Sequence, residues 1–201
     1  MPNNERSYHH GELRETLIRT SLELISEVGL TGFSVAKVAQ RAGVSSGAPY
    51  RHFPDRESLL AATATAFLTE LTSRLHAAVN AAGNDALDRL ASTTGAYVLY
   101  AADYHVGFEM FAAMKGAHFS PFHEQSREMI DFVISLVQEA APDASWSEIV
   151  ELMEAHLALS QGFSYMHRQG AFSQKKLTKE QIAAQASTAA RYLIAGRKQL
   201  L

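Results

Sequence analysis

Hydrophobic residues recur every three or four positions along most of this chain, which is the spacing of an amphipathic α-helix. Strands would be indicated by alternating runs of β-branched residues bounded by turn residues. The sequence contains no convincing run of this kind. The pattern therefore predicts an all-α fold. A first helix is expected to end near Gly29, and its apolar face consists of Leu13, Leu17, Leu24 and Val28.

Capping residues mark where the next helices begin. Ser34 is a good N-cap for a short second helix that carries Val35, Val38 and Ala39 and that the turn at 42–44 interrupts. A long helix is then expected to follow Asp55 and to run toward Ala82. Its inward face consists of Leu59, Leu60, Phe67, Leu68, Leu71 and Leu75.

Four more helices are expected in the remaining sequence. One runs from Asp85 to about Tyr104, after the break at 83–85, and another begins at Ser120-Pro121. The motifs Ser145-x-x-Glu148 and Thr178-x-x-Gln181 are capping boxes, which predict the starts of the last two.

The stretch AGVSSGAPYRHF, residues 42–53, interrupts this helical pattern with Gly, Ser and Pro. Ser45 is a suitable N-cap, and Pro49 would then occupy the fourth helical position, where only one backbone hydrogen bond is lost. Gly47 keeps side-chain bulk low on the first turn. Val44 and Phe53 are expected to anchor the segment in the core. A helix, a tight turn and a small polar helix indicate a helix-turn-helix, whose second helix enters the DNA major groove.

Charge is distributed unevenly. The chain of 201 residues has a formal net charge of −3. Residues 1–56 nevertheless have a net charge of +1, the remainder has −4, and the segment from Ser34 to Arg56 alone has +3. A local basic surface is the electrostatic signature of nucleic-acid binding, so the helix-turn-helix is the expected DNA-binding region.

The run from Tyr8 to about Leu60 resembles the N-terminal DNA-binding domain of the TetR family of bacterial transcriptional regulators. The shared features are the glycine-terminated first helix, the A-x-x-A-G-V-S turn, the Y-x-H-F group and the start of a long helix at 55–60. The resemblance implies a helix-turn-helix domain over residues 1–56 and a helical ligand-binding and dimerisation domain over 57–201. Pro49 and Arg51 depart from the residues frequent in this family, which leaves the operator sequence open.

The resemblance also implies individual roles in DNA binding. It places Ser46, Gly47, Ala48, Tyr50 and Arg51 on the recognition helix, facing base edges or phosphates, with His52 at its end. Ser34, Lys37, Ser45 and Arg56 match positions that typically contact the DNA backbone. The residues Tyr8, His9, His10 and Arg14 form either an arm near the adjacent groove or a disordered tail.

Aromatic and Met residues are concentrated between Tyr97 and His123. Such side chains line small-molecule pockets, and they also fill ordinary helical cores. The family resemblance favours a pocket for a mostly apolar or aromatic effector. The candidate ligand-binding residues are Tyr97, Tyr104, Phe108, Phe111, His118, Phe163 and Met166.

Several function classes are excluded or disfavoured by the residues present. The absence of Cys removes disulfides and thiolate chemistry, and no apolar run approaches the ~20 residues of a membrane span. The N-terminus lacks the apolar core of a signal peptide, so we expect a cytoplasmic protein. His118 and His123 do not have the spacing of two ligands on one helical face, and no catalytic motif is present, so we expect no metal, no cofactor and no enzyme.

Two hypotheses follow from these observations. The first is a homodimeric repressor that a small molecule releases from a palindromic operator. The second is a helical interaction protein that binds DNA constitutively, with the aromatic cluster as core. Dimerisation is expected through the last two helices, whose apolar residues are Ile149, Leu152, Met153, Leu157, Ile182, Ala189, Leu193 and Ile194.

Overall fold

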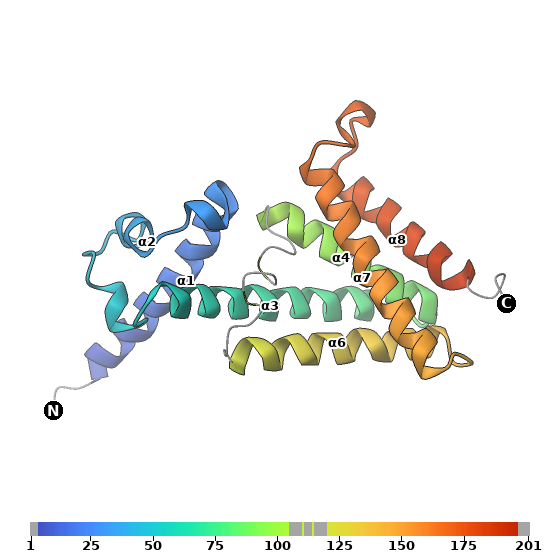
Figure 1. Cartoon of the computed structure of the whole chain (residues 1–201), viewed down its shortest axis with the longest axis horizontal. Helices are drawn as coiled ribbons and strands as arrows, with labels where there is room; N and C mark the ends of the chain where they lie inside the picture. The colour runs from blue at the N-terminus through green and yellow to red at the C-terminus, as the bar shows by residue number, and fades with distance from the viewer. Residues whose placement is uncertain (1–3, 105–109, 111–113, 115–119, 197–201) are drawn as a thin grey trace. The chain divides into compact units, whose positions relative to one another are not determined.

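The computed structural model describes residues 4–104, Met110, Met114 and residues 120–196, with side chains described for 12–104, Met110, Met114 and 121–196. Every regular element within these residues is helical, which confirms the predicted all-α fold (Figure 1). The chain divides into two compact units: residues 1–68 with 109–122, and residues 69–108 with 123–201. These units are defined by contacts rather than by independent folding, so the domain division after Arg56 stays a prediction.

The N-terminal unit contains α1 (Asn4–Gly32), α2 (Val35–Arg41), the 3₁₀ helix η1 (Pro49–Arg51) and the first part of α3 (Arg56–Ala81). The first helix is interrupted at Gly29, whose φ of 70° and ψ of 175° are not helical. Glycine adopts this positive φ without steric cost, which confirms the predicted end of the regular helix there. The core of this unit includes Leu17, Val38, Phe53 and Leu59, each at most 3% exposed.

The C-terminal unit contains the rest of α3 with α4 (Ala86–Tyr104), α6 (Ser120–Ala140), α7 (Trp146–Arg168), the 3₁₀ helix η2 (Ser173–Lys175) and α8 (Lys179–Gly196). Helix α4 packs against both α7 and α8, which also pack against each other. One core cluster joins five helices through Val79, Leu90, Val133, Leu136, Val137, Ile149 and Ile194. A second consists of Val98, Phe172, Ile182, Ala183 and Ala186.

The caps predicted at Asp55 and Ser145 are present. The Asp55 carboxylate accepts a hydrogen bond from the Ser58 amide at 2.7 Å and so caps α3. Ser145 and Glu148 form the reciprocal capping box of α7. Backbone N–H groups in the first turn of a helix have no partner within the helix, and side-chain oxygens placed three residues away satisfy them.

One premise of the dimer prediction is wrong. Ile149, Ile182 and Ile194 were expected to offer apolar surface to a second copy, but they are 6%, 1% and 2% exposed inside their own protomer. They face α4 and the other helices of the C-terminal unit because the helical period places them on the same side as the buried core. Only the outward faces of α7 and α8 remain for a partner.

Candidate nucleic-acid interface

The turn after α2 places the recognition segment on the outside of the N-terminal unit. Ser34 caps α2 by accepting a hydrogen bond from the Lys37 amide at 3.3 Å. The Ala42 amide donates to the Val38 carbonyl at 2.9 Å, and Gly43 then reverses the chain with a φ of 70°. A positive φ is strained for most residues other than glycine, so Gly43 is what permits this tight turn.

The recognition segment is shorter than predicted. We expected an α-helix capped by Ser45, but the structure has a turn at 45–48 followed by the 3₁₀ helix Pro49–Arg51. The Ser45 carbonyl accepts from the Ala48 amide at 3.0 Å, because Pro49 has no N–H with which to make the α-helical bond. The carbonyl of Pro49 accepts from the amides of His52 and Phe53, each at 2.9 Å, which closes the segment.

Burial separates this segment into an anchored side and an accessible side. Pro49 and Phe53 are buried, and the Arg14 guanidinium lies 5.3 Å from the centre of the Phe53 ring. Ala48 and His52 are half-buried. The exposed residues are Ser45, Ser46, Gly47, Tyr50 and Arg51. Of the predicted recognition residues, Tyr50 and Arg51 are therefore the large polar side chains presented to solvent.

The basic side chains around this surface differ in their partners. Arg41 makes a two-pronged ion pair with Glu27, at 2.5 and 2.6 Å, which raises the pKa of the guanidinium and lowers that of Glu27. Arg51 has no ion pair with another described residue. The +3 charge of this segment is thus partly compensated by Glu27 on α1, and within the described residues Arg51 has no such carboxylate partner.

Lys37 and Arg56 both reach back to the last turn of α1. The Lys37 ammonium donates to the Gly32 carbonyl at 3.0 Å, and the Arg56 guanidinium donates to the Leu30 carbonyl at 3.2 Å. Arg56 also lies 5.3 Å from the centre of the Phe33 ring. Both cations are exposed, so their predicted contacts with DNA phosphates remain compatible with this geometry.

The sequence indicated Arg14 as part of a possible arm near the groove, but not its contact with the Phe53 ring, and it did not indicate the Arg41–Glu27 pair. Arg41 and Glu27 are 14 residues apart on different helices. Only the way α1 and α2 pack brings them together, so no local spacing could have indicated the contact.

Four of the predicted ligand-binding residues are described, and they lie on two helices of the C-terminal unit. Tyr97 is buried on α4, and the Tyr104 hydroxyl donates to Glu70 at 2.9 Å. Phe163 on α7 stacks on Phe172 with ring centres 6.0 Å apart, while Met166 is 45% exposed. Phe108, Phe111 and His118 lie outside the described residues. The assignment of these residues to a pocket stays a prediction.

Two further features of the described residues bear on other functions. Among them, no group of three or more His, Cys, Asp or Glu side chains could hold a metal ion. None of the described helices is long and apolar enough to cross a membrane.

Similarity to known proteins is concentrated at this interface. Residues 17–63 match the family model described as bacterial regulatory proteins, tetR family. The class C tetracycline repressor protein of Escherichia coli is 46% identical over 56 residues, which cover 28% of this chain and 26% of that protein. The transcriptional regulator BetI of Stenotrophomonas maltophilia is 38% identical over 77 residues, covering 38% of this chain and 39% of BetI. The chain thus spans between a quarter and two fifths of the length of these curated relatives.

Similarity to solved structures extends over nearly the whole chain. A protein of unknown function from Rhodococcus sp. RHA1 has a TM-score of 0.73 at 28% identity, covering 94% of this chain and 97% of that one. A tetR-family transcriptional regulator from Streptomyces coelicolor has a TM-score of 0.72 at 17% identity, covering 95% and 84%. With the helix-turn-helix described above, these matches show that residues 17–63 are a DNA-binding domain of the tetR-family type, and that the chain as a whole shares the fold of these solved structures.

Proposed function

We propose that this protein is a DNA-binding transcriptional repressor that acts in the cytoplasm as a homodimer and is released from a palindromic operator by a small, mostly apolar molecule. The observation that carries the proposal is the exposed pair Tyr50 and Arg51, held outward by the buried Pro49 and Phe53. An aromatic ring and a guanidinium that makes no ion pair with the described residues, both on one short segment, suit contacts to base edges and phosphates. One relative is a tetracycline repressor, which supports repression rather than activation. We assign the protein no catalytic activity.

Phosphate and base contacts have separate sources in this proposal. The residues that contact the DNA backbone are Ser34, Lys37, Ser45 and Arg56. The residues that face base edges in the major groove are Ser46, Gly47, Ala48, Tyr50, Arg51 and His52. Hydroxyls and cations at the phosphates set the register of the protein on the duplex, while contacts to base edges provide specificity.

The outward face of α8 supports the homodimer. This face consists of Gln181, Ala184, Gln185, Thr188, Tyr192 and Ala195, all exposed, and none is charged. The solvent face of a surface helix normally carries charged residues, so an uncharged face with a 74% exposed Tyr192 suits a helix–helix interface. The exposed side of the adjacent α7 includes the small residues Ala158 and Gly162, and a side chain at Gly162 would meet no neighbour within its own protomer. We therefore place the second copy on α7 and α8.

The effector site is proposed in the helical domain that the sequence predicts over residues 57–201. Apolar surface and two hydroxyl groups are supplied by Tyr97, Tyr104 and Phe163. The further candidate residues of the effector site are Phe108, Phe111, His118 and Met166. Such a lining suits a mostly apolar molecule oriented by one or two hydrogen bonds. The stacking of Phe163 on Phe172 in a hydrophobic cluster favours the alternative, a constitutive DNA-binding protein whose aromatic residues are core.

The proposal is tested by selecting preferred duplexes from a random pool with the full chain. We expect a two-fold symmetric sequence, and Arg51→Ala should relax preference at one position of each half-site. Lys37→Ala and Arg56→Ala should instead weaken binding to all sequences and reduce the slope of log affinity against log salt by about one each. No enrichment of any sequence would contradict the proposed function, and unchanged binding by all three variants would contradict the proposed interface.

A further inference from the structure

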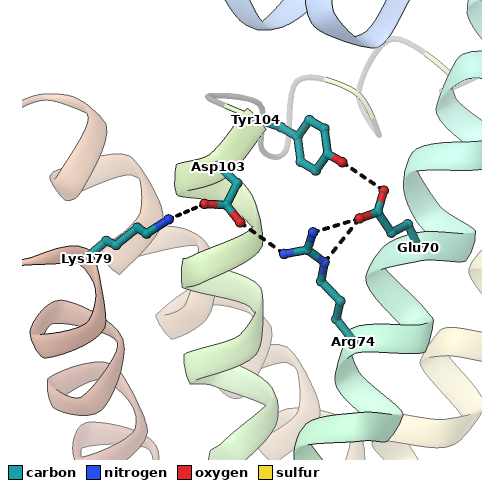
Figure 2. Close-up of polar contacts among 5 residues, drawn as sticks. All are labelled: Glu70, Arg74, Asp103, Tyr104 and Lys179. Carbon is teal, nitrogen blue, oxygen red and sulfur yellow. Dashed lines mark hydrogen bonds and ion pairs between the residues drawn. The ribbon is translucent and has the colours of Figure 1, made fainter. Parts of the chain in front are cut away.

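A network of polar side chains joins three helices inside the C-terminal unit (Figure 2). Glu70 and Arg74 lie on α3, Asp103 and Tyr104 at the end of α4, and Lys179 at the start of α8. We call these five residues the α3–α4–α8 junction. Its members are distant in sequence, since Tyr104 and Glu70 are 34 residues apart and Lys179 and Asp103 are 76 apart.

Each carboxylate of the junction is shared between two partners. One Glu70 oxygen accepts from Arg74 at 2.7 and 3.2 Å, and the other accepts from the Tyr104 hydroxyl at 2.9 Å. One Asp103 oxygen accepts from Arg74 at 3.0 Å, and the other accepts from Lys179 at 2.5 Å. The adjacent cations lower the pKa of Asp103, Lys179 contributing most, so this carboxylate stays ionised at neutral pH.

Arg74 is the centre of the junction. Its guanidinium donates to Glu70 on its own helix and to Asp103 on α4, and it lies 4.8 Å from the centre of the Tyr100 ring. The Tyr100 side chain is fully buried, so the guanidinium is held between a fixed aromatic face and two carboxylates. A planar guanidinium in such a site fixes orientation in a way that a flexible ammonium does not.

The junction is better suited to fixing the alignment of the three helices than to stabilising the folded chain. Its charged side chains are 31% to 44% exposed, and ion pairs this exposed contribute little to the free energy of unfolding. The hydrogen bonds nevertheless specify how α3 is rotated and shifted along its axis relative to α4 and α8. Removing them would leave the helices folded while allowing α3 other positions.

Helix α3 is the element through which such a change would be transmitted. It is one continuous helix, whose residues up to Leu68 belong to the N-terminal unit and whose residues from Thr69 belong to the C-terminal unit. Glu70 and Arg74 lie within two turns after this boundary. At its other end, Arg56 donates to the Leu30 carbonyl and so ties α3 to the DNA-binding helices.

We propose that Glu70, Arg74 and Asp103 are positioning residues for DNA binding, which act by holding α3 in the alignment that a specific operator requires. The inference rests on the proposed function. A palindromic operator requires a fixed separation between the two DNA-binding domains of a dimer. If only a fraction of the molecules has this separation, the apparent affinity for the operator is reduced in proportion to that fraction. Binding to non-specific DNA has no such requirement, because it depends on phosphate charge alone.

The experiment compares Arg74→Met with the matched control Arg191→Met. Arg191 is 40% exposed, against 39% for Arg74, and it also pairs with a carboxylate on α4, Asp88, but neither of its ion-pair partners lies on α3. Affinity is measured for the duplex selected by the parent chain and for a scrambled duplex. We expect Arg74→Met to bind the selected duplex about tenfold more weakly and Arg191→Met to bind it as the parent does. Both variants should bind the scrambled duplex like the parent and should unfold within about 4 °C of it.

A double-mutant cycle then tests whether the junction acts as one unit. Asp103→Asn should weaken operator binding in the parent and have little further effect when Arg74 is already Met, because the shared contact is gone. Operator affinity unchanged by Arg74→Met, or lowered equally by Arg191→Met, would overturn the inference while leaving the proposed function intact. Failure of the parent to select any duplex would overturn both.

Discussion

His156 is a titratable side chain buried among hydroxyl groups rather than carboxylates. It is 1% exposed on α7, and its Nε2 lies 2.8 Å from the Thr93 hydroxyl and 3.3 Å from that of Thr94. Because the Thr93 hydroxyl donates to the Leu90 carbonyl, its oxygen can accept from Nε2–H of the neutral ring. Burial lowers the pKa of His156 to about 4, since no charged partner compensates for the lost hydration of the imidazolium.

This burial predicts a loss of stability in acid. The unfolded chain takes up a proton on His156 near pH 6.5, whereas the folded chain does so only near pH 4. The stabilisation by neutral His156 is therefore complete above pH 6.5 and is lost as the pH falls toward 4, by about 3 kcal/mol in all. His156→Gln cannot titrate, so its free energy of unfolding should fall by correspondingly less between pH 7 and pH 4. The free energy of unfolding of both proteins is measured by urea unfolding at each pH. An equal decrease for parent and variant between pH 7 and pH 4 would contradict this prediction.

Helices α4 and α8 approach each other closely at Gly95. A Cβ atom at this position would lie 2.5 Å from the Ser187 hydroxyl oxygen and 3.3 Å from the Ala183 carbonyl oxygen. The hydroxyl could rotate away, but the carbonyl belongs to the backbone of α8. The absence of a side chain at Gly95 is therefore what allows the two helices to pack at this distance.

Gly95→Val should separate these helices. The branched side chain would overlap the α8 backbone, and we expect a loss of about 2 kcal/mol in the free energy of unfolding, as for other overpacked cores. Ser187→Ala should cost far less, because it removes only the movable neighbour. Denaturant unfolding of both variants measures this difference, and a Gly95→Val protein as stable as the parent would show that the helices can separate without cost.

The elements also show which local structures were predictable. Ser34, Asp55 and Ser145 cap helices where expected, because a cap involves backbone groups only three residues away. The recognition segment was predicted as an α-helix, and this was wrong. Pro49 has no N–H for the α-helical bond to the Ser45 carbonyl, and it is buried together with Phe53, so the segment is a turn followed by a 3₁₀ helix.

Assembly provides a test of the proposed homodimer. Thr188 lies in the middle of the uncharged outward face of α8. Thr188→Arg would bury an unpaired charge at the proposed interface, so we expect it to sediment as a monomer at micromolar concentration, where the parent sediments as a dimer. Asn84→Arg, in the exposed connection between α3 and α4, is the control and should remain dimeric. A monomeric parent would contradict the proposal directly.

The candidate DNA site was more predictable than the candidate effector site. The helix-turn-helix has a recognisable local pattern, so Tyr50 and Arg51 could be placed on an exposed surface from neighbouring residues alone. The aromatic residues after Tyr97 had two interpretations, pocket and core, because both use the same side chains. Tyr104 illustrates the difficulty, since its hydroxyl bonds to Glu70 on another helix, which no spacing within α4 could have indicated.

The sequence by itself determined the helical class, the positions of the main helices and the candidate segment for DNA binding. These features depend on periodicity and caps, which involve residues three or four positions apart. The tertiary structure decided which side chains meet across helices: Arg41 with Glu27 over 14 residues, Tyr104 with Glu70 over 34, and Lys179 with Asp103 over 76. Such contacts exist only after apolar burial has brought the helices together, so they belong to the folded chain and not to any local pattern.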